Sequence, residues 1–280
     1  ILNVSAPGVL SNDSDVETTN TSLYVMVVNP PEHGTLSLSS YGSFSYSPNQ
    51  HYAGSDRFTY KVRDSNSEYS DTATVNINIG AVNDVPVTAG ETYTTNEDTS
   101  MTISAGFGIL KNDTDVEGSI LTPSIDTGVS NGTLTLNTDG SFNYSPNTNW
   151  FGSDSFTYHV NDGTDDSNTS TVTINVTSVN DIPAANNESY TTVEDTPLTV
   201  DAASGVLAND TDVETASLTP SVVNLPSHGT LVLNSATGGF TYTPTANYNG
   251  ADFFTYRVSD GAAYSTEATV SITVTPVNDA

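Results

Sequence analysis

Apolar and polar residues alternate with a period of two along most of this chain. In residues 57–63, Phe58, Tyr60 and Val62 occupy every second position, and charged or hydroxyl-bearing residues lie between them. Successive side chains of a β-strand point to opposite faces, so this alternation predicts a strand with one face in a core and the other in water. No segment shows the 3.6-residue period of an amphipathic helix. The sequence therefore predicts an all-β fold.

The same pattern occurs three times. Phe-Thr-Tyr stands at residues 58–60, 156–158 and 254–256, and Val-Asn-Asp stands at residues 82–84, 179–181 and 277–279. Copies lie 97 or 98 residues apart, which is the size of one immunoglobulin-like β-sandwich. We place boundaries near Asp84 and Asp181, which gives three tandem sandwiches at residues 1–84, 85–181 and 182–280. Because Ile1 aligns with Met101, we expect an excised segment whose first sandwich lacks an N-terminal strand.

Each unit is expected to hold about seven strands. Residues 132–136 and 141–144 alternate on either side of a turn that contains Asp139-Gly140. Glycine supplies the positive φ that a tight hairpin needs, so these residues predict a β-hairpin. Equivalent hairpins are expected in the other two units.

Composition narrows the function. The chain has 5 basic and 33 acidic residues, a net charge of −28, and such a surface repels nucleic acid and anionic membranes. It has no run of 18 apolar residues, so we expect no membrane insertion in this segment. Cysteine is absent. Small extracellular β domains commonly need a staple, and here only a metal can supply it.

A short acidic motif follows an apolar anchor in every repeat. Residues 205–214 read Gly-Val-Leu-Ala-Asn-Asp-Thr-Asp-Val-Glu, and near-copies stand at residues 8–17 and 108–117. Carboxylates spaced i, i+2 in an irregular loop suit a hard cation such as Ca²⁺. Asn and Asp also cap turns through backbone amides. Capping does not require several carboxylates to gather, however, and two of them ~4 Å apart repel by roughly 4 kcal/mol at an effective dielectric of 20. We therefore favour a cation site in every repeat.

The motifs together resemble a known family over nearly the whole chain. They are Asn-Glu-Asp-Thr at residues 96–99, the Asn-Asp-x-Asp motif, His-Gly-Thr-Leu at residues 228–231, Phe-Thr-Tyr-x-Val and Val-Asn-Asp. This set is similar to the bacterial cadherin-like tandem repeats of large surface adhesins and RTX-type proteins. The resemblance implies Ca²⁺ between successive domains. The ions would be held by acidic residues of the upper domain, the linker Asn-Asp, and the Asp-x-Asp pair and a later Asp of the lower domain.

Matching motif to motif carries these ligands onto two junctions. The first junction would use Asp56, Asn83, Asp84, Asp113, Asp115 and Asp162. The second junction would use Glu97, Asp154, Asn180, Asp181, Asp210, Asp212 and Asp260. The chain departs from the cadherin pattern in two places, where acidic residues are replaced by Ala81, Ser178 or Pro276 in the linker and by Phe58, Phe156 or Phe254 before the Tyr strand. One or two ions per junction are therefore expected in place of three.

Two functions from different classes are consistent with these observations. The favoured one is a calcium-stiffened extender in a bacterial cell-surface or secreted adhesin, with homophilic contacts or surface polysaccharide as partners. The alternative is a carbohydrate-binding module, which would need outward-facing aromatic residues, and most aromatic residues here alternate inward, with Tyr41 and Phe253 as exceptions. The four histidines form no Ser/His/Asp or zinc-binding pattern, so we expect no enzyme activity.

Overall fold

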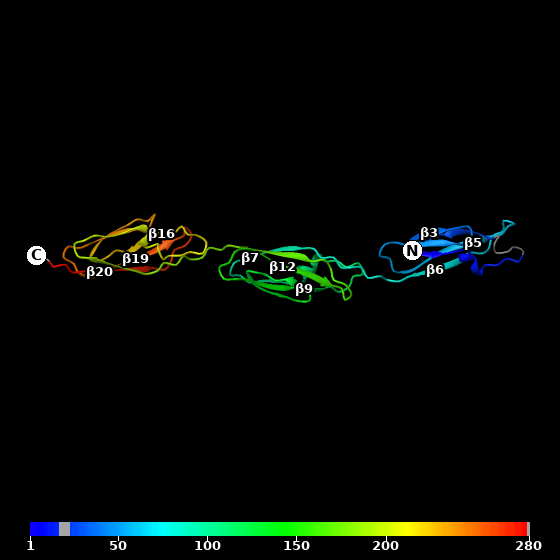
Figure 1. Cartoon of the computed structure of the whole chain (residues 1–280), viewed down its shortest axis with the longest axis horizontal. Helices are drawn as coiled ribbons and strands as arrows, with labels where there is room; N and C mark the ends of the chain where they lie inside the picture. The colour runs from blue at the N-terminus through cyan, green and yellow to red at the C-terminus, as the bar shows by residue number, and fades with distance from the viewer. Residues whose placement is uncertain (17–22, 279–280) are drawn as a thin grey trace.

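Three β-sandwiches follow one another end to end in the computed structural model, which describes residues 1–16 and 23–278 (Figure 1). The predicted all-β class is confirmed. The only helical segments among the described residues are short 3₁₀ turns: η1 (Gly8–Asn12), η3 (Ala105–Phe107), η4 (Ile109–Asn112) and η5 (Ala202–Ser204).

The middle unit shows the architecture in full. A four-stranded sheet has the order β7-β13-β12-β9, and a three-stranded sheet has the order β10-β11-β8. Strand β7 runs parallel to β13, and the other neighbours are antiparallel. The strands are β7 (Glu91–Asn96), β8 (Met101–Ile103), β9 (Thr122–Thr127), β10 (Gly132–Leu136), β11 (Phe142–Pro146), β12 (Gly152–Asn161) and β13 (Ser170–Thr177).

The third unit repeats this topology with sheets β14-β20-β19-β16 and β15-β18-β17. Its strands are β14 (Glu188–Val193), β15 (Leu198–Val200), β16 (Thr219–Asn224), β17 (Gly229–Leu233), β18 (Phe240–Pro244), β19 (Gly250–Ser259) and β20 (Ala268–Thr275).

The first unit has two three-stranded sheets, β1-β4-β3 and β2-β5-β6. Among its described residues no strand pairs with β6 in the way that β7 pairs with β13. Its strands are β1 (Leu2–Val4), β2 (Tyr24–Asn29), β3 (Gly34–Leu38), β4 (Phe44–Pro48), β5 (Gly54–Arg63) and β6 (Ala73–Ile79).

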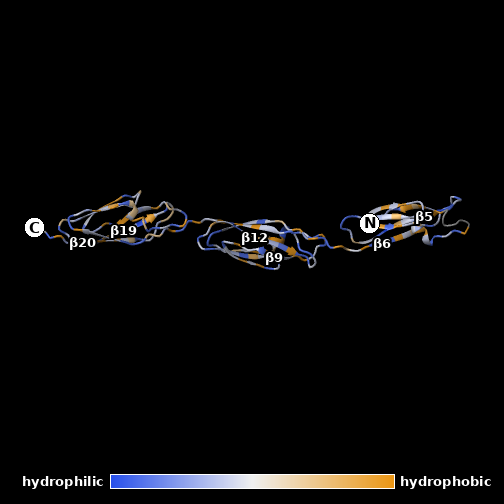
Figure 2. Cartoon of the chain, in the orientation of Figure 1, coloured by the Kyte–Doolittle hydropathy of each residue, from blue (hydrophilic) through white to orange (hydrophobic). Residues whose placement is uncertain are grey.

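Each unit has its own core of buried apolar side chains, and Figure 2 shows apolar residues recurring along the strands. In the middle unit Phe156, Tyr158 and Val160 of β12 are at most 1% exposed. Phe142 of the opposite sheet meets Phe156 edge to face, with ring centroids 5.8 Å apart. Burying such side chains contributes about 1.5–3 kcal/mol each to folding. The two-residue alternation thus becomes a packed interior, and the carboxylates are left for the strand ends and loops.

A candidate metal site at the domain junctions

Glu97 ties the end of β13 to the second linker. Its backbone N–H donates to the Thr177 carbonyl (2.9 Å), and its Oε1 accepts the Val179 N–H (2.6 Å). The side chain is 3% exposed, and its other oxygen, Oε2, has no hydrogen-bond partner. Glu194 makes the same contacts with Thr275 and Val277 in the third unit. A buried carboxylate therefore stands beside the linker with one free oxygen.

The next domain reaches the same linker through two side chains. Glu214, at the end of the acidic motif, accepts the Asp181 N–H at Oε2 (3.0 Å). Asp260 accepts the Asn180 side-chain N–H (2.9 Å). Since both contacts cross from linker to domain, they hold the linker against the third sandwich.

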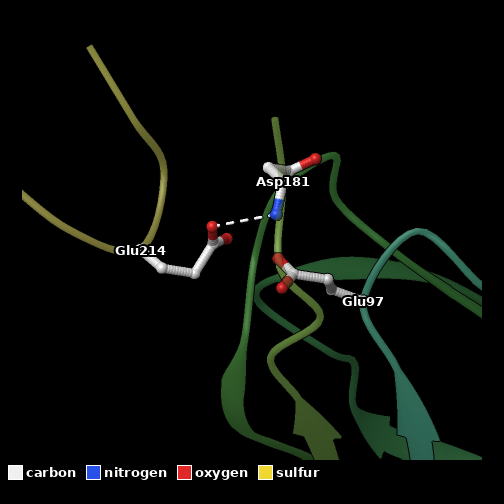
Figure 3. Close-up of side chains that lie close together, drawn as sticks. All are labelled: Glu97, Asp181 and Glu214. Atoms are coloured by element: carbon white, nitrogen blue, oxygen red, sulfur yellow. Dashed lines mark hydrogen bonds between the residues drawn. The ribbon is translucent and has the colours of Figure 1, made fainter. Parts of the chain in front are cut away.

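Glu97, Asp181 and Glu214 come together at this point, with carboxylate oxygens that all lie within 4.8 Å of one another. Figure 3 shows Glu97 and Glu214 approaching the linker from different directions. Four buried oxygens at this junction have no hydrogen-bond partner among the described residues: Glu97 Oε2, Asp181 Oδ2, Asp212 Oδ2 and Glu214 Oε1. Buried polar atoms are almost always satisfied, so these four oxygens could serve as ligands of a metal ion.

The carboxylates at this junction repel one another. Partial burial raises the pKa of Asp181, and the carboxylates of Glu214, Asp98, Glu97 and Asp212 raise it further. No lysine or arginine lies within ion-pair distance of these groups among the described residues. A cation bound here would remove the repulsion.

The first junction repeats part of the arrangement. Glu117 Oε2 accepts the Asp84 N–H (3.1 Å), and Asn83 donates to Asp162 (2.8 Å). The Oδ2 atom of Asp115 is buried without a partner. The Asp84 side chain also has a histidine neighbour, because His51 Nδ1 lies 2.6 Å from Asp84 Oδ2.

Asp56 and Asp154 occupy a different environment from the other predicted ligands. Asp154 is 4% exposed and accepts the N–H groups of Ser130, Asn131 and Ser155 and the Tyr144 hydroxyl, all between 2.9 and 3.0 Å. Asp56 and Asp252 make the equivalent bonds in their units. Burial alone would raise the pKa of Asp154, but these hydrogen bonds outweigh it and lower the pKa. The structure therefore does not bring Asp56 or Asp154 into the junction cluster.

The two members of each Asp-x-Asp pair have different neighbours. Asp113 accepts the Tyr158 hydroxyl (3.1 Å) and the Ala89 N–H (3.1 Å) within the middle sandwich, whereas Asp115 carries one of the orphaned oxygens. Asp210 binds Tyr256 and Asn186 in the same way, and Asp212 is the junction partner. The pair thus divides between an internal pocket and the junction.

Glu91 lies with Asp113 in the internal pocket of the middle unit, and Glu188 lies with Asp210 in the equivalent pocket of the third unit. Neither glutamate was predicted. Both oxygens of Glu91 are buried without a hydrogen-bond partner. Burial and the Asp113 charge raise the pKa of Glu91 to about 7, and burial, with a smaller contribution from Asp210, raises that of Glu188 to about 7.

Glu117 and Glu214 were also missed as linker contacts. The signal was present, because a glutamate stands two residues after the second Asp in both motifs. Nothing in that spacing shows that its side chain reaches back to the linker.

Comparisons with known proteins identify the family of this chain. The sequence profile of the bacterial cadherin-like domain matches residues 1–81, 83–178 and 180–276. The chain therefore belongs to the bacterial cadherin-like domain family. Domains of this kind are in general non-enzymatic and generally bind Ca²⁺, and the fold is typical of extracellular proteins.

Solved cadherin ectodomains share the fold. Domains 3–6 of protocadherin gamma B2 are 16% identical, with 92% of this chain and 68% of that chain covered and a TM-score of 0.53. Domains 1–5 of the same protein are 12% identical, with 92% and 54% covered and a TM-score of 0.60. The protocadherin gamma B4 extracellular domain is 11% identical, with 91% and 44% covered and a TM-score of 0.61. A search of curated proteins finds no significant match.

Proposed function

We propose that this chain is a calcium-stiffened extender of a bacterial cell-surface or secreted adhesin. The observation that carries the proposal is the set of four orphaned carboxylate oxygens at the second junction. They come from the middle domain, the linker and the third domain, so one bound cation would connect all three. Homophilic contacts of such a rod follow from the resemblance to cadherins and are part of this proposal.

The donor set fits Ca²⁺. All four groups are carboxylates, and Ca²⁺ takes six to eight oxygen ligands in flexible geometry. Glu97, Asp181, Asp212 and Glu214 would hold the ion at the second junction, and Asp84, Asp115 and Glu117 would do so at the first. The proposed sets omit Asp56 and Asp154, whose oxygens already accept protein donors, and assign Asp113 and Asp210 to the internal pocket.

Calcium would stiffen the chain by mass action. The ion binds the arrangement in which linker and domains are docked, and not a splayed one, because only the docked arrangement brings the carboxylates together. Without the ion, carboxylates within 4.8 Å of one another repel. The sites thus convert calcium binding into rigidity between neighbouring sandwiches.

Calorimetric titration of the full chain with CaCl₂ tests this proposal. Glu214→Gln and Asp181→Asn each remove one ligand charge, so we expect the affinity of one class of site to fall at least about tenfold while the first junction is unaffected. Asp71→Asn is the matched control, because Asp71 is exposed and takes no part in the contacts at either linker. Calcium heats that are absent, or equal in all three variants and the wild type, would contradict the proposal.

A further inference from the structure

Three of the five basic residues of the chain lie on one face of a single strand. Arg57, Lys61 and Arg63 occupy outward positions of β5, and the residues between them, such as Phe58 and Tyr60, are buried. Side chains two residues apart on a strand point the same way at about 6.6 Å spacing. We call Arg57, Lys61 and Arg63 the β5 strip.

Among the described residues, no carboxylate forms an ion pair with the β5 strip. Every ion pair among the described residues involves a histidine, although the chain has 33 acidic residues. The Arg63 guanidinium lies 5.7 Å from the centre of the Tyr24 ring, and that ring lies 5.9 Å from the exposed ring of Tyr41. The strip therefore presents three cations, with aromatic rings at one end.

A polar cavity of about 650 Å³ opens beside the other end of the strip, at Arg57. This volume lies within the range of small-molecule sites, about 300–1,000 Å³. Asn29 and Thr59 are held together there by a hydrogen bond from the Asn29 side chain to the Thr59 hydroxyl (2.9 Å). Besides Arg57, the lining offers amide, hydroxyl and imidazole groups and two carboxylates: Asn29, Ser55, Thr59, Asn76, His33, the exposed Glu32 and the buried Asp56. The oxygens of Asp56 already accept N–H and O–H donors of the protein. Such groups suit a ligand rich in hydroxyls.

The other two units lack this combination. The position of Arg57 is Ser155 in the middle unit and Phe253 in the third. The first unit has nine acidic and three basic residues, the middle unit thirteen and one, and the third eleven and one. The least acidic unit therefore carries the cationic face.

We propose that the outer face of the β2-β5-β6 sheet in the first unit binds a saccharide that carries carboxylate or sulfate groups. A guanidinium pairs with planar oxyanions through two parallel hydrogen bonds. Arg57 would take one such group in the cavity, where the neighbouring amides and hydroxyls meet sugar hydroxyls. Lys61 and Arg63 would take acidic groups farther along the chain of sugars.

An acidic saccharide fits this face better than a second copy of the protein. The cavity beside Arg57 is lined by hydrogen-bonding groups that match sugar hydroxyls. The acidic residues elsewhere in the chain repel a short saccharide on this face only weakly, because charges more than about 8 Å apart are largely screened at physiological ionic strength.

The test is a binding titration of the full chain in EDTA at 50 mM NaCl, so that calcium cannot bridge two carboxylates. The probes are hexagalacturonate as the acidic saccharide, maltohexaose as the neutral one, and hexaglutamate as a peptide of equal charge. We expect hexagalacturonate alone to bind measurably. Arg57→Gln with Lys61→Gln should weaken it at least about tenfold, which is 1.4 kcal/mol. The matched control, Lys111→Gln with Arg257→Gln, removes the same charge elsewhere and should change binding less than twofold.

Folding is checked by thermal unfolding. Arg57→Lys should bind more tightly than Arg57→Gln because it keeps the charge, but less tightly than the wild type because an ammonium lacks the two parallel N–H groups of a guanidinium. The proposal is overturned by an absence of hexagalacturonate binding, by equal losses in the strip and control variants, or by equal binding of hexaglutamate. Sedimentation at the same salt supplies a further contrary outcome, a dimer that the strip variant loses, which would assign the face to a second copy.

Discussion

Single residues decide which carboxylates are available to a cation. Asp154 lies one residue before Ser155 on a strand, and its remaining donors come from Ser130, Asn131 and Tyr144. The sequence shows that an acidic residue recurs before each Phe-Thr-Tyr strand. It does not show which distant N–H groups donate hydrogen bonds to that residue. Recurrence alone therefore marks Asp154 and Glu97 equally. Only the structure shows that the oxygens of Asp154 are satisfied and that one oxygen of Glu97 is not.

The internal pocket gives stability a pH dependence. Burial raises the pKa of Glu91 and Glu188 from 4.5 to about 7 in the folded chain. Between about pH 5 and 7 the folded chain therefore binds more protons than the unfolded chain, so its stability falls as pH rises. We expect the melting temperature in EDTA to be a few degrees lower at pH 8 than at pH 5.5. Glu91→Gln with Glu188→Gln should shrink that difference.

Two features shape that measurement. Asp181, whose pKa is also raised, contributes with the same sign, so the double variant reduces the pH dependence without abolishing it. Glu68→Gln serves as a control at an exposed position. Equal melting temperatures at pH 5.5 and pH 8 would show that the pocket carboxylates titrate normally.

At the scale of elements, alternation predicted the strands well and the acidic loops poorly. The hairpin of β10 and β11 has the predicted strands, with Leu136 opposite Phe142. The Gly-Ile-Leu segment before the acidic motif was expected only as an apolar anchor, but it forms the 3₁₀ turn η4. That turn is positioned by the hairpin, because Ile109 N–H donates to the Gly140 carbonyl (3.1 Å). Such long-range support has no local sequence signature.

Gly108 allows the acidic loop to pack on the hairpin turn. A Cβ at this position would lie 2.1 Å from the Gly140 carbonyl oxygen, which belongs to backbone and cannot swing away. We expect Gly108→Ala to destabilise the middle unit by about 1–3 kcal/mol, as overpacking does, in a chemical denaturation experiment. Gly128→Ala is the control, because a Cβ there has no atom within 4 Å. Equal stability of the two variants would mean that the loop moves aside freely.

At the scale of the whole molecule, the sequence predicted the repeat and some of the residues that meet between repeats. The motif Val-Asn-Asp located the linker, and Asp181 with Glu97 was expected at the second junction, where the structure places both. Glu117 and Glu214 were not expected, because the family resemblance supplied no ligand at that position. These glutamates reach the linker N–H groups of Asp84 and Asp181. The part of the site that depends on one domain meeting the next was therefore the part that sequence reasoning found least completely.

These contacts make the shape of the chain depend on calcium. Each sandwich is roughly 40 Å long, so a rigid row of three would approach about 120 Å. Chelation should leave the β-sheet circular dichroism unchanged and reduce the maximum dimension in small-angle X-ray scattering, because repelling carboxylates let the linkers bend. Asp181→Ala, or Asp212→Ala with Glu214→Ala, should loosen the second junction alone and give an intermediate dimension with calcium. Asp71→Ala should behave as the wild type. If the maximum dimension is the same with calcium and with chelator in the wild type and in Asp181→Ala, these carboxylates cap turns and do not stiffen the rod.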